Sequence, residues 1–178
     1  MINIAKQIEA STPSRSLFIT YCASLPFFEQ DILAYLQQVG DGRVTVLLDD
    51  AQYQASFSDF VRGAGTRYRL HPVRLPRKSA NFHAKLYLLT SHSKADLLVG
   101  SANLTPSGFR ANAEIVDQLT LSEERQEDSP AIAQYVAMLR LLPHLDPHLP
   151  GPVLQQIEEF GNNLERLGAQ PTTTTRGP

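Results

Sequence analysis

The chain has 178 residues, and its 16 lysines and arginines against 18 aspartates and glutamates give a formal net charge of −2. Hydrophobic residues make up 42%, which is ordinary for a globular protein and sufficient for one well-buried core at this length. Because the net charge is close to zero, the molecule as a whole does not have the charge of a nucleic-acid-binding protein. Cys22 is the only cysteine, which excludes a disulfide within the chain and a cysteine-based zinc cluster.

The N-terminus lacks the apolar core of a signal peptide, and no hydrophobic run is long enough to span a membrane. We therefore expect a soluble, cytoplasmic protein that does not associate with membranes.

The first third of the chain predicts alternating helices and strands. Met1–Ala10 has weak helical spacing and is a short helix or an arm. Ser16–Ala23 and Arg43–Asp49 have the composition of buried strands, and Phe27–Val39 between them carries apolar residues at helical intervals. This strand–helix–strand unit implies parallel pairing with a right-handed crossover. Ala51–Arg62 is ambiguous, with a helix as the better interpretation.

The middle of the chain predicts the remaining strands. Arg67–Leu75 alternates as a third strand, and Pro72 places this strand at an edge of the sheet or marks a break. Two short apolar runs, Leu86–Leu89 and Leu97–Val99, flank a polar turn and predict a hairpin. Ala113–Leu121 is the last predicted strand.

Two amphipathic helices, Pro130–Leu142 and Val153–Leu167, follow a polar linker. The chain is thus expected to be an α/β protein, with a mixed, largely parallel β-sheet flanked by helices and a C-terminal helical pair. We expect a core domain over residues 1–121, a helical extension of the same domain over 122–168, and a disordered low-complexity tail over 169–178.

Polar residues of distinct chemistry stand beside the predicted hairpin. His83 and Lys85 precede its first strand, and alternation points both side chains to the same face. The second strand runs into a Gly-Ser-Ala-Asn turn, and the hairpin returns Ser101 and Asn103 to the end where His83 and Lys85 lie. A nucleophile or acid, a fixed cation and two hydrogen-bonding groups then meet at one place, which suits a tetrahedral phosphate and its transition state.

The order His-x-Lys, strand, Gly-Ser-x-Asn and then Glu resembles the HKD motif of the phospholipase D superfamily. The matching residues are His83, Lys85, Gly100, Ser101, Asn103 and Glu114. The phrase SANLTPSGFRANAE is most similar to HKD-type nucleases, and the resemblance implies a phospholipase D-like fold with this motif in its catalytic domain. One position departs from the pattern: the family usually has Asp a few residues after the Lys, whereas this chain has Thr90 there and Asp96 further on.

The resemblance also implies a role for each residue. His83 is expected to attack phosphorus and form a phosphohistidine, while Lys85, Ser101 and Asn103 bind the phosphate. Glu114 is expected to accept the other ring N–H of His83. A second histidine must protonate the leaving oxygen, so a chain with one motif predicts a homodimer with two copies of His83 across one cleft. No metal or other cofactor is expected.

Charge is distributed unevenly near the motif. No acidic residue lies between Asp59 and Asp96, whereas Arg74, Arg77 and Lys78 lie just before His83. These three are expected to form a basic approach for nucleic acid, the alternative being an ordinary solvated rim.

Three functions from different classes remain open. The first is a metal-independent phosphodiesterase that cleaves nucleic acid, DNA in preference to RNA. The second is an inactive nucleic-acid-binding or assembly module of a larger DNA-processing or defence complex. The resemblance to HKD nucleases separately suggests a helicase or ATPase partner. The third is a lipid hydrolase with the same chemistry. A zinc site is not expected, because the remaining histidines lack compact spacing: His71, His92, His144 and His148.

Overall fold

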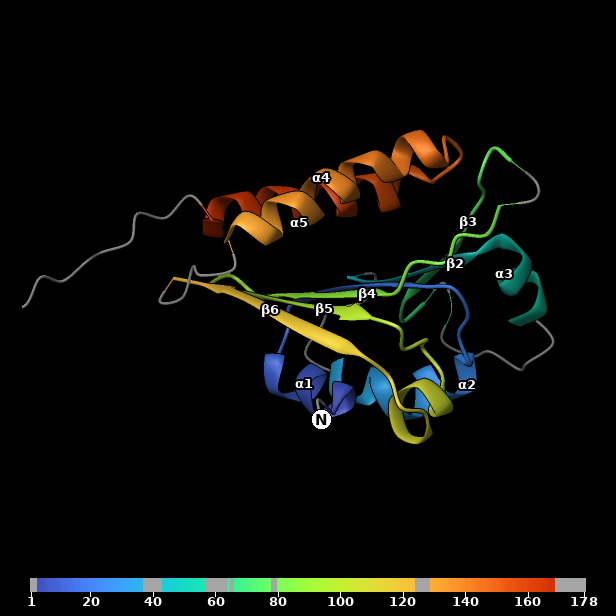
Figure 1. Ribbon diagram of the computed structural model, residues 1–178. Coiled ribbons are helices and arrows are strands. Elements are labelled where there is room, and N and C mark those ends of the chain that lie inside the picture. The colour runs from blue at the N-terminus through green and yellow to red at the C-terminus, as the bar shows by residue number, and fades with distance from the viewer. Residues whose placement is uncertain are drawn as a thin grey trace, which may run out of the picture.

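The fold is a β-sheet between two helical layers, as seen in a computed structural model of the chain (Figure 1). The structure describes residues 3–36, 43–56, 64, 66–77, 80–123 and 129–168. The tail predicted to be disordered, 169–178, lies outside the described residues.

The sheet has six strands in the order β3-β2-β1-β4-β5-β6. Their bounds are β1 (Arg15–Thr20), β2 (Val44–Asp49), β3 (Arg69–Val73), β4 (Leu86–Thr90), β5 (Lys94–Gly100) and β6 (Val116–Ser122). The predicted mixed α/β sheet flanked by helices is confirmed, and so is the edge position of the strand that contains Pro72.

The parallel pairings are confined to β1 with β2 and β2 with β3, whereas β1 with β4, β4 with β5 and β5 with β6 are antiparallel. The expectation of a largely parallel sheet therefore holds only for the first three strands. For β4 and β5 the reason is the length of the connection, because the turn of three residues between them is too short for the crossover that parallel neighbours need.

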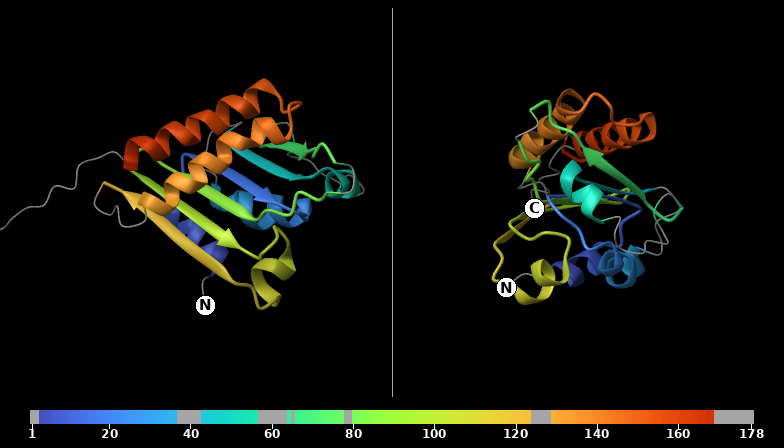
Figure 2. Two further views of the ribbon diagram at one scale, coloured as in Figure 1. Left: turned by 45° about the horizontal axis from the view of Figure 1, so that its top comes forward. Right: turned by 90° about the vertical axis from the view of Figure 1, so that its right-hand side faces the viewer.

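Helices cover both faces of the sheet. One face carries α1 (Ile4–Ser11), α2 (Leu25–Phe27), η1 (Phe28–Ile32) and η2 (Leu33–Leu36). The other carries α4 (Ser129–Leu145) and α5 (Gly151–Gly168), which lie side by side across the strands (Figure 2). Two short elements, α3 (Asp50–Ser56) and η3 (Ser107–Ala111), lie near the end of the sheet where β1 and β2 finish.

The helix predicted over Phe27–Val39 is irregular, because it divides into one α-helical turn, a π-helical turn and a 3₁₀ turn. Phe27 and Phe28 are both buried, as are Ile32 and Leu33.

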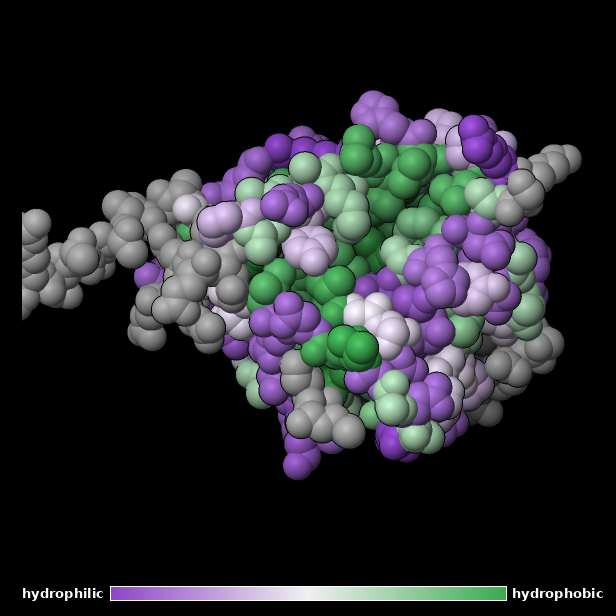
Figure 3. Space-filling view, viewed as in Figure 1, coloured by the Kyte–Doolittle hydropathy of each residue, from purple (hydrophilic) through white to green (hydrophobic). Residues whose placement is uncertain are grey.

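The strands contribute alternate side chains to two cores. Phe18 of β1 packs with the layer of α1, α2 and η1, whereas its neighbours Leu17 and Ile19 pack with α4 and α5. Since both faces are covered, the strands are almost continuously apolar. Figure 3 shows hydrophobic residues among polar ones on the surface of the face that carries the α4–α5 layer in the upper part of the view.

Strand directions bring five segments together at one end of the sheet. The carboxyl ends of β1, β2 and β5 meet the amino ends of β4 and β6 there, as the pairs Ile19–Leu86 and Leu86–Val99 show. A backbone hydrogen bond of 3.3 Å from the Gly100 amide to the Lys85 carbonyl closes this end of the hairpin. We call it the carboxyl edge, after the ends of the parallel strands, and it holds the candidate site.

Candidate active site at the carboxyl edge

His83 and Lys85 lie in an extended segment just before β4 rather than within the strand. The Nζ of Lys85 nevertheless lies 2.7 Å from Nδ1 and 3.1 Å from Nε2 of the His83 ring, and it donates to the His83 carbonyl at 3.2 Å. An ammonium group only donates, so a ring nitrogen bonded to it uses its lone pair as the acceptor. The contact therefore places a cation directly beside the ring of His83.

Tyr21 holds the other side of this pair. Its ring centroid lies 4.6 Å from that of His83, and the Lys85 Nζ lies 5.7 Å from the Tyr21 centroid. The Tyr21 hydroxyl accepts a hydrogen bond of 3.2 Å from Gln52 Nε2 on α3. The ring is thus fixed at both ends and limits where His83, which is exposed to solvent, can turn.

Asn103 is placed by the end of β1. Its Oδ1 accepts long hydrogen bonds of 3.4 Å from the Thr20 hydroxyl and 3.5 Å from the Cys22 amide. The Leu104 amide donates to the same Thr20 hydroxyl at 3.2 Å. With its oxygen turned toward β1, the side chain of Asn103 is left with its amide N–H groups for a ligand.

Glycine is required where η3 packs against Asn103. A Cβ added to Gly108 would lie 2.4 Å from the backbone oxygen of Asn103 and 2.9 Å from its nitrogen, closer than such atoms approach. The same holds for Gly100, where a Cβ would lie 2.0 Å from the Ile115 oxygen. These two glycines let the backbone of the site fold tightly on itself.

Ser101 and Glu114 form a hydrogen-bonded pair. The Ser101 hydroxyl donates to Glu114 Oε2 and accepts a bond of 3.0 Å from the Ile115 amide, and Asn112 Nδ2 donates to Glu114 Oε1 at 3.2 Å. Among the described residues, the Glu114 carboxylate therefore bonds Ser101 and Asn112 rather than the His83 ring. The role expected for Glu114 toward His83 stays a prediction.

Lys85 is the electrostatic centre of the site. Burial lowers the pKa of Lys85 from its ordinary value, and the neighbouring Cys22 and Glu114 partly offset that fall. Burial likewise raises the pKa of the Cys22 thiol, against the effect of the nearby Lys85 charge. Cys22 is thus a neutral thiol beside the cation, and it adds no negative charge to a phosphate site.

Asp49 connects the end of β2 to the segment that carries His83. Its side chain is buried, and Oδ2 accepts a hydrogen bond of 2.8 Å from the Phe82 amide. Oδ1 accepts bonds of 3.0 Å and 3.4 Å from the amides of Ala51 and Gln52, which begin α3. One buried carboxylate therefore fixes both the helix and the approach to the nucleophile.

The basic segment before His83 is divided between the two ends of the sheet. Arg74 and Arg77 line a groove of about 480 Å³ together with Asp49 and Asn81, close to His83. The Nε of Arg74 lies 3.3 Å from an Asp50 carboxylate oxygen, an exposed ion pair. Arg69 lies at the opposite end of β3 and belongs to a different surface, and Lys78 lies outside the described residues.

Thr90 stands where the family usually has Asp, and the nearby Asp96 is a buried carboxylate. Thr90 is buried at the end of β4, and Asp96 lies on β5 opposite Leu89, one residue away. Burial acts to raise the pKa of Asp96, but hydrogen bonds from Lys94, Ser11 and Thr120 outweigh it, and the pKa falls below its ordinary value. This carboxylate ties α1 to the sheet through Ser11 Oγ at 2.7 Å.

No group of three or more His, Cys, Asp or Glu side chains that could hold a metal ion occurs in the described part of the chain. The same part contains no helix that combines the length and the apolar character needed to cross a bilayer.

Sequence reasoning missed Tyr21, Asp49 and the Cys22 amide as parts of the site. Tyr21 and Cys22 directly follow the carboxyl end of β1, and Asp49 is the last residue of β2. The available signal was their position, since ligands of open α/β sheets bind beyond the carboxyl ends of parallel strands.

The fold and the site define an α/β domain with a histidine–lysine pair, an asparagine and a serine–glutamate pair at one end of a mixed sheet. No protein-family model and no curated protein matches the chain. Among solved structures, the chain is similar to NucT from Helicobacter pylori, with 11% sequence identity over 79% of this chain and 87% of NucT and a TM-score of 0.49.

It is also similar to Nuc from Salmonella typhimurium, a phospholipase D family member, with 13% identity over 89% of this chain and 86% of Nuc and a TM-score of 0.43. These likenesses concern the fold, whereas the functional argument depends on the side chains of the site.

Proposed function

We propose that the chain is a phosphodiesterase that cleaves nucleic acid, DNA in preference to RNA, through a phosphohistidine on His83. The observation that carries the proposal is the contact of 2.7 Å between Lys85 Nζ and His83 Nδ1, beside Asn103 and the Ser101–Glu114 pair. A nucleophile, a cation and neutral hydrogen-bond donors around one point are the groups that stabilise phosphoryl transfer.

In the first step a neutral nitrogen of His83 attacks phosphorus. A P–N bond forms, the bond from phosphorus to the leaving oxygen breaks, and the leaving oxygen takes a proton from a second, protonated imidazole. Lys85 and the Asn103 amide hold the non-bridging oxygens, where negative charge increases. Before attack, Lys85 must turn its N–H groups from the ring to the phosphate.

In the second step water attacks the phosphohistidine. The second imidazole, now neutral, takes a proton from the water, and the P–N bond breaks with its electron pair returning to His83. The products are a phosphomonoester and a free hydroxyl, and both imidazoles regain their first protonation states. The chemistry balances without a metal ion, since Lys85 and the protonated imidazole supply the positive charge.

The second imidazole is proposed to be His83 of a second copy of the chain. The exposed position of His83 supports this arrangement, because an exposed ring can face its equivalent across a two-fold axis. Arg74, Arg77 and Lys78 are proposed to guide the nucleic acid to the site. Arg74 and Arg77 in the groove beside Asn81 support this path.

Hydrolysis in the presence of EDTA tests the chemistry. We expect cleavage of a labelled oligonucleotide to survive EDTA, and to be lost in His83→Ala with the fold intact by circular dichroism. Rapid denaturation during turnover should trap labelled phosphate on wild-type protein and leave His83→Ala unlabelled. A strict requirement for Mg²⁺ would overturn the mechanism, and turnover of phosphatidylcholine in place of the oligonucleotide would favour the lipid hydrolase.

Mixing wild-type and His83→Ala subunits tests the shared site. If both imidazoles act in one site, an equal mixture that exchanges freely retains about a quarter of the wild-type activity, whereas independent sites retain about half. Salt-dependent DNA binding without any cleavage would instead favour the inactive binding or assembly module. A helicase or ATPase partner and a cytoplasmic location stay predictions.

A further inference from the structure

A second polar surface lies at the opposite end of the sheet from His83. Two adjoining hollows of about 210 Å³ and 470 Å³ run beneath α5, past the starts of β1 and β2, and share Arg15, Arg43 and Glu159 in their walls. We call this surface the arginine groove. Its basic members are Arg15, Arg43, Arg69 and Arg166.

Three of these arginines lie on neighbouring strands. Arg15 and Arg43 each directly precede a residue of the paired couple Ser16–Val44, and Arg69 begins β3 opposite Thr45. Adjacent strands lie about 4.8 Å apart and Arg69 is two residues further along than Arg43, so the three cationic side chains start within about 12 Å of one another. Like charges gathered on one face of neighbouring strands repel one another, and a bound anion would offset that repulsion.

The groove supplies little of that compensation itself. Glu159 is the one acidic side chain among its described lining residues, and it lies 3.3 Å from the Arg15 guanidinium. Arg166 donates to the carbonyl of His92 and to Asn163 Oδ1. Within the described part of the chain, the guanidinium groups of Arg43 and Arg69 have no carboxylate partner.

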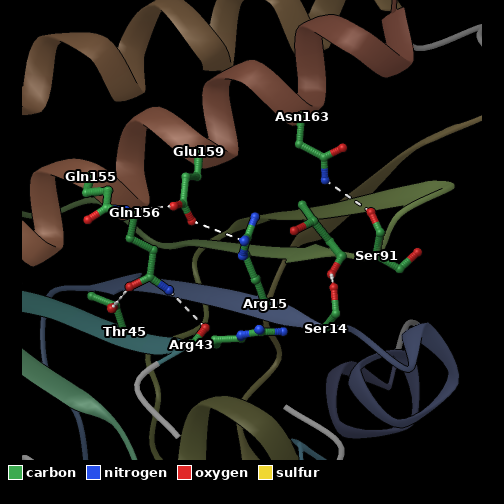
Figure 4. Close-up of polar contacts among 10 residues, drawn as sticks. Ser14, Arg15, Arg43, Thr45, Ser91, Gln155, Gln156, Glu159 and Asn163 are labelled. Atoms are coloured by element: carbon green, nitrogen blue, oxygen red, sulfur yellow. Dashed lines mark hydrogen bonds and ion pairs between the residues drawn. The ribbon is translucent and has the colours of Figure 1, made fainter. Parts of the chain in front are cut away.

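The floor of the groove is held rigidly. Gln156 of α5 is 5% exposed, its Oε1 bonds the Thr45 hydroxyl, and its Nε2 donates to the Arg43 carbonyl at 2.9 Å. Figure 4 shows Gln156 pointing from α5 to the start of β2, beside the Arg15–Glu159 pair. The backbone that carries Arg43 is therefore fixed to α5, so this backbone loses little conformational freedom when a ligand binds.

We propose that the arginine groove binds phosphate groups, and specifically the phosphodiester backbone of a nucleic-acid strand away from the cleavage site. Guanidinium groups match phosphate oxygens in pairs, and backbone phosphates dominate the affinity of nucleic-acid binding. The six residues of β1 separate the groove from the carboxyl edge by about 20 Å. The ligand is thus a second segment of a long strand and cannot be the phosphate under attack.

Salt-dependent binding tests the groove independently of cleavage. The experiment uses His83→Ala protein, so that a fluorescent oligonucleotide of about 20 nucleotides stays intact whether or not the wild type is a nuclease. Adding Arg43→Gln and Arg69→Gln is expected to weaken binding about tenfold and to lower the slope of log Kd against log salt by about 1.5, the value for two lost phosphate contacts. Arg43→Lys should retain part of the affinity, because it keeps the charge.

The matched control is Arg140→Gln, which removes one exposed arginine of α4 paired with Glu165, compared with Arg43→Gln alone. A second arm measures thermal stabilisation by inorganic phosphate. Loss of oligonucleotide affinity supports a bound strand, and loss of phosphate stabilisation alone supports a small phosphate ligand in the same groove. If Arg43→Gln and the double variant change neither measurement more than Arg140→Gln does, the proposal is wrong.

Discussion

Asp49 and Phe82 are joined by a hydrogen bond of 2.8 Å from the Phe82 amide to the Asp49 carboxylate. The bond connects the carboxyl end of β2 to the residue directly before His83, 33 positions later in the sequence. Because the carboxylate also caps α3, the helix that supports Tyr21 and the segment that carries His83 share one anchor. Asp49 therefore constrains both the backbone just before His83 and the helix that holds the ring of Tyr21.

Replacing Asp49 by Ala should misplace His83. The variant loses the bonds to the Phe82 and Ala51 amides, and we expect kcat to fall at least tenfold with a smaller change in KM. Chemical denaturation should show a loss of about 1 to 3 kcal/mol of stability. Assays at a temperature where the variant is fully folded separate the two effects, and an unchanged kcat there would show that Asp49 only stabilises the fold.

The alkaline limit of the proposed activity should come from Lys85. The proposal needs a protonated Lys85 to hold the phosphate, and burial lowers the pKa of this lysine, so its charge is lost as the pH rises through a value below the ordinary one. As the pH is raised, activity is therefore expected to start to fall at a lower pH than the titration of a solvent-exposed lysine would give. In Lys85→Arg the guanidinium stays charged, so any residual activity should lose this decline.

A pH–rate profile of kcat/KM for both proteins, from pH 6 to about 11, measures the effect. The same alkaline decline in wild type and Lys85→Arg would assign it to a different group.

Glu114 is expected to act through Ser101, to which it is hydrogen-bonded. If so, Ser101→Ala and Glu114→Gln remove the same interaction, and the double variant should lose no more activity than the worse single variant. The measurement is a double-mutant cycle on kcat/KM. A severe loss in Glu114→Gln with a mild one in Ser101→Ala would instead show that Glu114 turns to His83 when substrate binds.

Gly108→Ala should disturb Asn103 without touching any side chain of the site. The new Cβ meets the Asn103 backbone at 2.4 Å, so Asn103 must move and its hold on the phosphate should weaken. We expect kcat/KM to fall about tenfold or more. Gly151→Ala is the matched control, because a Cβ there meets nothing within 4 Å, and equal activity in the two variants would contradict the prediction.

Asp96→Ala should destabilise the fold in a pH-dependent way. The pKa of Asp96 is lowered in the folded protein, so its carboxylate contributes stability above the unfolded pKa, and this contribution is lost as the pH falls through the folded pKa. At neutral pH we expect the variant to lose about 2 to 3 kcal/mol, with the difference from wild type shrinking in acid. Urea unfolding at several pH values measures this, and a difference independent of pH would assign the loss to packing.

The sequence by itself determined the strands, the helical pair at the C-terminus, the edge position of Pro72 and the order of the motif residues. These features depend on local patterns, because apolar periodicity records which face of an element is buried and a hairpin brings near neighbours together. The same local reasoning gave Phe27–Val39 as one helix, whereas the described part of that segment divides into short turns of different helical type.

Only the tertiary structure decided which distant residues support the site. The order and direction of the strands put Tyr21 against His83 and join Asp49 to the Phe82 amide, and the same arrangement brings Arg69 to the arginine groove. Such neighbours depend on the pairing of β1 with both β2 and β4, and local sequence patterns do not predict that pairing. Contacts across strands form only when burial of the whole sheet fixes strand order, and that is a property of all the side chains together.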